Sequence, residues 1–252
     1  MAEKRENGND STLEADVQTD KRVNSDSNAI SQKPLDEIPN GGTTAWLQVL
    51  GSFLLFMNNW GVVQSFGAYQ TYYESNLLSH YRPSNISWIG TTQASLLIVV
   101  GILSGPFYDK GYFRHMIIIG SFLIVFGLMM LSITDQYFSI FLTQGLTVGL
   151  GSGLTYIPSL AIVSSYFSTK RAFAIGVAAS GSALGGIIYP IVFHRLEPRI
   201  GFPWSTRVIG FMAFGQLVTA VALFKPPNTR GGPARRLIDW YAILFLMLAN
   251  TN

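Results

Sequence analysis

Long apolar runs alternate with short hydrophilic breaks over most of this chain. The runs cover about residues 44–72, 87–108, 115–133, 137–167, 172–193 and 208–224, and the breaks between them are charged or contain proline. Each run is long enough to cross a hydrocarbon core of about 30 Å as a helix. Because a helix satisfies its own backbone hydrogen bonds in lipid, the pattern predicts an all-α, polytopic membrane protein with about six transmembrane helices.

The two ends of the chain depart from this alternation. Residues 1–42 are polar and mixed in charge, with almost no aromatic side chains, so we expect a disordered tail. The first apolar run is too long for a cleavable signal peptide. Residues 225–252 begin with a basic segment and end with about ten apolar residues, which are too few to span a membrane. The six-helix unit is therefore expected over residues 43–224.

Composition narrows the classes of function. The chain is 48% hydrophobic and 12% charged, against about 25% charged in soluble domains. Zero cysteines exclude disulfides and cysteine-ligated metals, and we expect no metal and no cofactor. Although the net charge is +3, the bases form no stripe that would bind nucleic acid. The expected partners are membrane lipid and a small organic solute.

The distribution of bases predicts the orientation in the membrane. Lysines and arginines concentrate in the cytoplasmic loops of membrane proteins. With a cytoplasmic N-terminus, the inside bases outnumber the outside bases, and we expect Arg207 to lie partly inside the protein. A plasma-membrane location is expected, with Asn85 of Asn-Ile-Ser as an outside glycosylation candidate. The inside bases are Lys110, Arg114, Lys170, Arg171, Lys225, Arg230, Arg235 and Arg236, and the outside ones Arg82, Arg195, Arg199 and Arg207.

Neutral polar side chains within the apolar runs are the candidate substrate pathway. They either line a hydrophilic cavity or form hydrogen bonds between helices, and the sequence leaves both readings open. The helical parts carry no ionisable group that could couple transport to protons. The histidines fall at the ends of the runs, so an intramembrane protease, or any other enzyme, is not expected. The candidates are Asn58, Asn59, Gln64, Gln93, Tyr156 and Tyr189, and Gln144, Thr155 and Gln216 are further polar groups.

Glycines recur every four residues on single helical faces. Such faces let helix backbones approach closely, which favours association in lipid. We therefore expect tight helix packing at these positions. The glycines are Gly145, Gly149 and Gly153 in the fourth run, Gly181 and Gly185 in the fifth, and Gly101 and Gly105 in the second.

The stretch "GILSGPFYDKGYFR" resembles the signature between the second and third helices of the major facilitator superfamily. The matching residues are Gly105, Asp109, Lys110 and Arg114, but Gly111 follows the base directly, one position earlier than in the signature. The resemblance implies a cytoplasmic gate. By this resemblance Asp109 would be attracted to the positive end of a helix in the opposite half of the transporter, Gly105 would let that helix approach, and Lys110 and Arg114 would complete the network. The alternative is a basic loop that only orients the protein in the membrane.

Two further stretches are similar to the monocarboxylate porter family, in its fungal branch. "PNGGTTAWLQVLGSF" resembles the start of its first helix, and "YFSTKRAFAIGVAASGSALGG" resembles its fifth-helix signature. Together with the gate motif, they imply the N-terminal half-bundle of such a transporter, followed by a remnant of the cytoplasmic central loop. The signature residues here are Tyr166, Phe167, Lys170, Arg171, Gly176, Gly181 and Gly185.

The resemblance implies transport of a small organic solute by alternating access. The solute would be a monocarboxylate, a vitamin or a secondary metabolite, moved inward or outward. Complete members have two related halves, so this chain would require a missing C-terminal half. The alternative is a truncated, non-transporting protein that associates with a second copy or regulates a full-length relative. In either case we expect the uncovered face to carry the polar residues Asn58, Asn59, Gln64 and Gln93.

Overall fold

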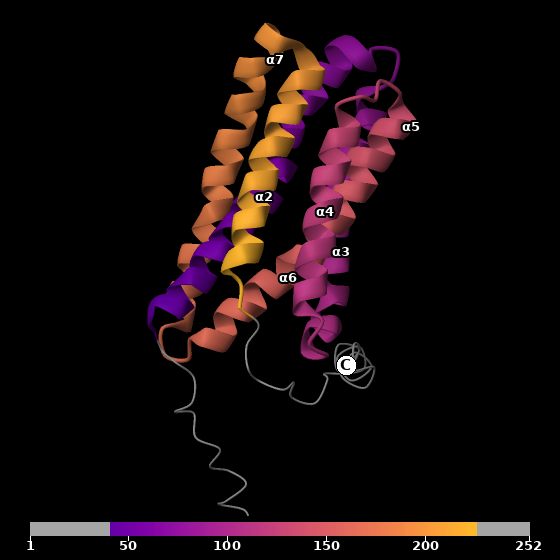
Figure 1. Ribbon diagram of the computed structural model, residues 1–252. Helices are drawn as coiled ribbons and strands as arrows, with labels where there is room; N and C mark the ends of the chain where they lie inside the picture. Colours follow the sequence, from indigo (N-terminus) through magenta and orange to yellow (C-terminus); the bar gives the residue numbers. More distant parts are fainter. Residues whose placement is uncertain (1–40, 226–252) are drawn as a thin grey trace, which may run out of the picture. The chain divides into compact units, whose positions relative to one another are not determined.

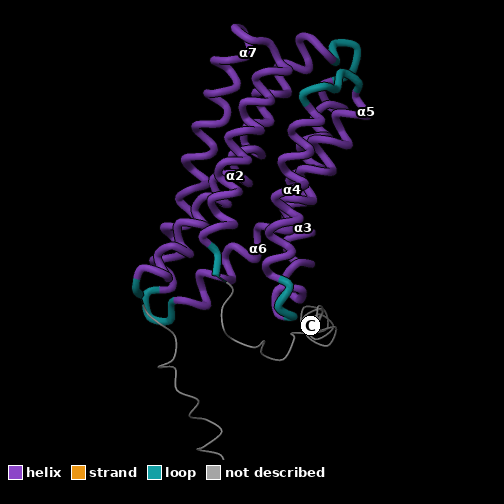
Figure 2. The backbone as a smooth tube through the Cα atoms, in the orientation of Figure 1, coloured by secondary structure: helices purple, strands orange, loops and turns teal. Residues whose placement is uncertain are grey.

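The computed structural model describes residues 41–225, and every regular element within that range is helical (Figures 1 and 2). Expectations for the N-terminal tail up to residue 40, and for Arg230, Arg235 and Arg236, lie outside the described residues. The helices are α2 (Thr43–Tyr72), α3 (Pro83–Asp109), α4 (Phe113–Leu131), α5 (Tyr137–Ile140), α6 (Gly149–Tyr166) and α7 (Arg171–Leu223), with π-helical segments η2 (Tyr73–Leu77) and η3 (Phe141–Val148).

The first four predicted runs agree with the observed helices to within a few residues. The fourth is one continuous helical stretch, Tyr137–Tyr166, in which η3 joins α5 to α6. The fifth and sixth runs differ from the prediction, because α7 continues through the expected break at residues 194–207. Its backbone leaves the helical conformation at Gly201, where φ is 77° and ψ is 167°. Glycine tolerates positive φ, so the chain turns there, and its hydrophilic flanks stay helical.

Four helices are long and apolar enough to cross a membrane: α3, α4, the stretch Tyr137–Tyr166, and α7. The 53 residues of α7 provide two segments, one on each side of Gly201. Helix α2 is not among the four, because its many neutral polar side chains lower its hydropathy. It nevertheless contains 30 residues and no charged side chain. The all-α membrane fold predicted from the sequence is confirmed.

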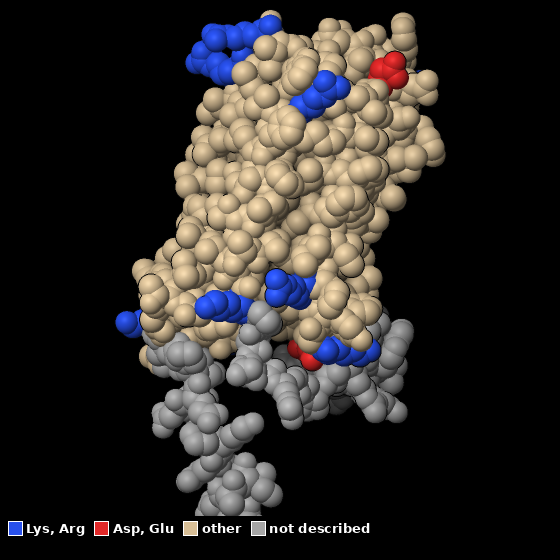
Figure 3. Space-filling model, viewed as in Figure 1, with Lys and Arg blue, Asp and Glu red and all other residues tan. Residues whose placement is uncertain are grey.

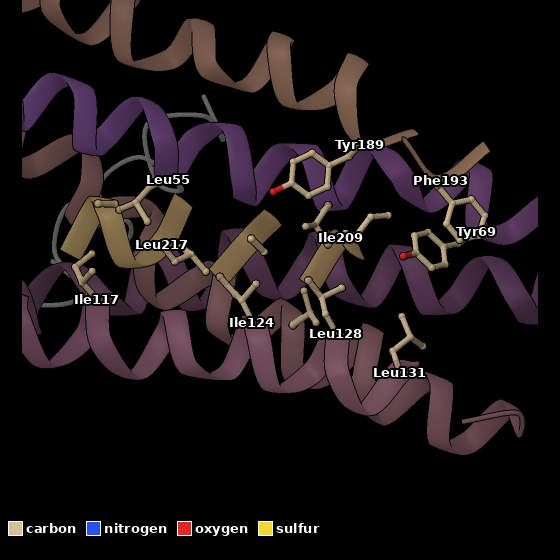
Figure 4. Close-up of a cluster of buried hydrophobic side chains, with 14 of the residues drawn as sticks. Leu55, Tyr69, Ile117, Ile124, Leu128, Leu131, Tyr189, Phe193, Ile209 and Leu217 are labelled. Atoms are coloured by element: carbon tan, nitrogen blue, oxygen red, sulfur yellow. The ribbon is translucent and has the colours of Figure 1, made fainter. Parts of the chain in front are cut away.

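The helices pack in pairs around a shared apolar core. Helix α2 contacts α7 most extensively, α3 lies along α6, and α4 contacts both α6 and α7. Figure 4 shows Ile124 and Leu128 of α4 directed toward Leu217 and Ile209 in the second segment of α7. All four side chains are buried. The core therefore ties the end of α7 back to the middle of the chain.

Glycines allow the closest of these contacts. A methyl group added at Gly181 or Gly185 would collide with the backbone of α2 at Phe53 and Met57. One added at Gly149 would lie 3.1 Å from the Cα atom of Gln93 in α3. The glycine faces predicted for the fourth and fifth runs thus pack helices together. Gly105 is different, because a methyl group there would meet no atom within 4 Å.

Candidate functional site

A chain of two hydrogen bonds, one buried and one partly buried, joins α2 to both segments of α7. The Asn58 amide Nδ2 donates to the Tyr189 hydroxyl at 3.0 Å, and that hydroxyl donates to Gln216 Oε1 at 3.1 Å. Asn58 and Tyr189 are fully buried. Hydrogen bonds between membrane helices contribute on average about 0.6 kcal/mol each, so this chain adds stability and fixes the rotation of α2.

The neighbouring residue joins α2 to α6. Asn59 Nδ2 donates to Thr155 Oγ1 at 3.0 Å, and the Thr155 hydroxyl lies 3.2 Å from Asn59 Oδ1. Both residues are fully buried. We call Asn58, Asn59, Thr155, Tyr189 and Gln216 the polar core. Of the two readings that the sequence left open, hydrogen bonding between helices is the one that these five residues display.

Three of the four residues expected on the uncovered face are inside the bundle. Asn58, Asn59 and Gln93 have no exposed surface, so that expectation is wrong for them. The reason is geometric: consecutive helical residues point about 100° apart, and Asn58 meets α7 while Asn59 meets α6. Gln64 is exposed, as expected.

An aromatic and amide surface remains accessible beside the polar core. The ring of Tyr156, which is half-buried, packs edge-to-face against Trp60 at 6.1 Å and against Phe56 at 5.6 Å. Gln64 lies four residues after Trp60 and therefore on the same face of α2. Its side chain borders Gly186 of α7. We call Trp60, Gln64 and Tyr156 the aromatic-amide patch, which could contact an uncharged, partly apolar molecule.

The side chain of Gln93 is buried and makes no hydrogen bond with any of the described residues. Neither its Oε1 nor its Nε2 has a hydrogen-bond partner there, and the same holds for Asn58 Oδ1 and Ser152 Oγ. A buried polar group without a partner costs about 1–3 kcal/mol. Such groups require an ordered water or a second conformation that supplies partners. Asn58, Gln93 and Ser152 place such groups on α2, α3 and α6.

The gate motif forms a compact helix end. Asp109 is the last residue of α3, Gly111 N–H donates to the Tyr108 carbonyl at 2.9 Å, and Tyr112 N–H donates to the Phe107 carbonyl at 3.1 Å. This is a Schellman cap, which needs a left-handed residue directly after the C-cap. Gly111 meets that need with φ of 86°. The cap explains why glycine follows the base directly in this chain.

The charged residues of the motif have separate surroundings. Asp109 is half-buried, whereas Lys110 and Arg114 are exposed. The Lys110 ammonium lies 6.0 Å from the centre of the Phe107 ring, and Arg114 borders a groove between α4 and α7. Since nothing among the described residues fills the space beside Gly105, the approach of an opposing helix there stays a prediction.

The fifth-helix signature holds the same end of the bundle together. Phe167 is buried and packs edge-to-face against Trp46 at 5.6 Å. The Tyr166 hydroxyl donates to the carbonyl of Lys225 at 3.2 Å. Lys170 and Arg171 are exposed at the start of α7, and a methyl group at Gly176 would meet no atom within 4 Å. Tyr166 and Phe167 therefore hold this end of the bundle together. The exposed bases Lys170 and Arg171 are available to orient the helix in the membrane.

Some important residues gave no signal in the sequence. Gln48 lies in an apolar run, yet its Nε2 donates to the Leu223 carbonyl at 3.1 Å and its Oε1 accepts from Lys225 N–H at 3.1 Å. It thereby caps the end of α7. Trp60 was also missed, and only its position one residue after the asparagine pair could have indicated it.

The opposite end of the bundle carries the remaining bases. Arg207 is half-buried, as expected: its Nε donates to Ser132 Oγ at 3.2 Å, and its guanidinium lies 4.9 Å from the Trp204 ring. Asn85 is exposed in the first turn of α3, where its carbonyl accepts a hydrogen bond from Tyr137 at 3.0 Å. Figure 3 shows that charged side chains gather toward the two ends and leave a broad uncharged belt between them.

Comparison with known proteins identifies relatives of the chain. Residues 44–246 match the profile of the Major Facilitator Superfamily. MFS-type transporter dbaD of Emericella nidulans is 49% identical over 207 residues, which cover 81% of this chain and 46% of dbaD. MFS-type transporter eupM of a Phoma species is 41% identical over 232 residues, which cover 86% of this chain and 81% of eupM.

Two further comparisons concern efflux and fold. Aspyridones efflux protein apdF of Emericella nidulans is 37% identical over 187 residues, which cover 74% of this chain and 38% of apdF. The crystal structure of a peptide transporter, POT, in complex with sulfate superimposes with a TM-score of 0.64 at 19% identity, over 85% of this chain and 46% of POT. The chain therefore spans about half the length of dbaD and of POT.

Proposed function

Because the chain belongs to the major facilitator superfamily, we propose that it takes part in moving a small organic solute across a membrane by alternating access. The observation that carries this proposal is the aromatic-amide patch of Trp60, Gln64 and Tyr156, which lies next to the buried polar core. It offers a solute ring-stacking surface and an amide that can donate and accept hydrogen bonds. Fold and relatives support the same class of function.

The chemistry of the patch favours a neutral, partly apolar solute. Helix α2 contains no Asp, Glu, Lys or Arg that could pair with a carboxylate or an ammonium. A buried carboxylate without such a partner would be costly, so a monocarboxylate fits this half less well than a larger secondary metabolite. The relative apdF is named an efflux protein, which supports export as the direction.

We further propose that Asp109 acts at a gate on the side where α3 ends and α4 begins. The Schellman cap holds Asp109 in place, and the empty space beside Gly105 leaves room for a helix from another half. A carboxylate attracts the positive end of such a helix with about 0.3–1 kcal/mol when exposed and up to about 2 kcal/mol when partly buried. That range is enough to shift the balance between two conformations.

Deleting the gene in its source organism tests the transport proposal. At least one small organic product should move from the culture medium into the cells, as measured by mass spectrometry of both fractions. Wild-type protein should restore export, whereas Trp60→Ala or Asp109→Asn should fail to restore it while reaching the membrane at normal levels. Arg199→Gln, an exposed base outside the patch, the gate motif and the fifth-helix signature, is the matched control. An unchanged distribution of every product after deletion would contradict transport.

A second proposal concerns how the chain works. It resembles an N-terminal half, and it spans 46% of dbaD, yet it spans 81% of the shorter relative eupM. We propose that these 252 residues do not transport alone as a monomer and act together with a second transporter half, supplied by a second copy or a full-length relative. Gln64 is the one residue of the expected polar face that remains exposed. Hydrogen bonds between exposed polar side chains therefore supply only a small part of the free energy of association.

The mass of the purified chain in mild detergent tests this assembly. We expect a dimer or larger species, or a stable complex with a longer relative when both are expressed together. The same preparations are then reconstituted into vesicles, and the flux of the product identified by gene deletion is measured. A monodisperse monomer that moves this product across the bilayer would refute the assembly proposal and leave transport itself intact.

A further inference from the structure

A groove runs along the outer surface between α4 and the second segment of α7. Its volume is about 570 Å³, within the roughly 300–1,000 Å³ typical of small-molecule sites. Phe122 and Val125 line it from α4, and Phe214, Val218 and Ala222 line it from α7. It is separate from the aromatic-amide patch, because no residue of that patch belongs to its wall.

The groove is amphipathic along its length. Apart from Arg114 and Ser121, every lining residue is apolar. Arg114 lies in the first turn of α4, at the end of the bundle where Lys225 follows Phe224, another lining residue. No carboxylate is part of the wall. A ligand with a long apolar body and a negatively charged head therefore matches both the lining and its charge.

We propose that this groove binds one phospholipid with an anionic headgroup. One acyl chain lies between Phe122 and Val218, and the net negative charge of the headgroup is held by the Arg114 guanidinium, which can bind two phosphate or carboxylate oxygens at once. Lipid is the occupant favoured here because the groove lies along two helices that are long and apolar enough to cross a membrane. Its basic residue, Arg114, lies at the end of one of them. Bases at such ends attract anionic lipids.

Native mass spectrometry of the full chain, supplied with equal amounts of phosphatidylserine and phosphatidylcholine, tests the site. The wild type should retain phosphatidylserine about fivefold better, the effect expected of one base near the headgroup. Arg114→Gln should abolish the preference, whereas Lys170→Gln, at the same end but outside the groove, should keep it. Ala222→Trp should reduce retention of both lipids, and Ile119→Trp, exposed on α4 outside the wall, should not. Equal retention by the wild type would overturn the proposal.

A photo-crosslinking residue at Val218 of the full chain identifies the occupant directly. A lipid adduct is the expected product in membranes. A link to residues 226–252 of the same chain would assign the groove to that segment, and a covalent dimer would assign it to a second copy. Either product in place of the lipid adduct would overturn the assignment.

Discussion

At the scale of single residues, the polar core shows how uncharged groups are used inside this bundle. Asn58 and Asn59 are adjacent, and each bonds to a different helix, so one turn of α2 fixes two neighbours. In lipid the free energy of the apolar side chains changes little when a helix rotates about its axis, because lipid tails are as apolar as the neighbouring helices. Hydrogen bonds therefore specify the orientation of α2 more sharply than its apolar residues do.

A double-mutant cycle measures the bond between α2 and α6. Asn59→Ala and Thr155→Val should each lower the free energy of unfolding, and the double variant should lose less than their sum. The expected coupling energy is about 0.6 kcal/mol, and at most about 1.7 kcal/mol. Unfolding by sodium dodecyl sulfate, followed by circular dichroism, gives the four stabilities. Gln64→Ala, an exposed amide on the same helix, should show no coupling with Thr155→Val, and coupling near zero for Asn59 would contradict the pairing.

Several residues of the polar core could be singled out from the sequence, but their positions could not. Asn58, Asn59 and Tyr189 stand out because amides and hydroxyls are rare in apolar runs. Whether each faces a partner helix or the open side depends on the rotation of its helix and on which helices are neighbours, and that is a property of the assembled bundle. Gln48 shows the same limit, because the carbonyl that it caps is 175 residues away in sequence.

At the scale of helices, the boundaries followed from hydropathy with one exception. The run of polar residues before Gly201 indicates a loop, since a hydrophilic segment between two apolar runs usually forms a loop outside the membrane. Yet the helix persists on both sides, and the direction changes at a single glycine between Pro198 and Pro203. Hydropathy reports where the chain meets water and carries little information on whether the backbone stays helical there.

Glycine faces decide how closely α2 and α7 approach. We expect Gly185→Ala to lower the free energy of unfolding by about 1–3 kcal/mol, because the added methyl group would collide with the Met57 carbonyl and lie 3.1 Å from the Gly61 Cα atom. Gly176→Ala, in the same helix, meets no atom within 4 Å. It should leave stability unchanged or raise it by up to about 1 kcal/mol, since alanine favours helix more than glycine. Equal effects at the two positions would rule out the packing argument.

At the scale of the whole molecule, charge separates the two ends of the bundle. The end where α4 begins carries the bases Lys110, Arg114, Lys170, Arg171 and Lys225, and the opposite end carries Arg82, Arg195, Arg199 and Arg207. Among the described residues, the first end therefore has only slightly more bases than the opposite end. Arg207 is engaged with Trp204 and Ser132, which leaves fewer free bases at the opposite end. Bases in short loops remain on the cytoplasmic side, so the first end should be cytoplasmic.

The absence of cysteine from the sequence makes this orientation directly measurable. Single cysteines replace Lys170 at one end and Arg199 at the other, both of which are exposed. A membrane-impermeant maleimide applied to intact cells should label Arg199→Cys at once and Lys170→Cys only after the membrane is permeabilised. The cysteine-free parent shows the background, and a permeant maleimide confirms that both thiols can react. Labelling of Lys170→Cys in intact cells, with Arg199→Cys protected, would place the gate motif outside the cell and overturn the orientation inferred from the bases.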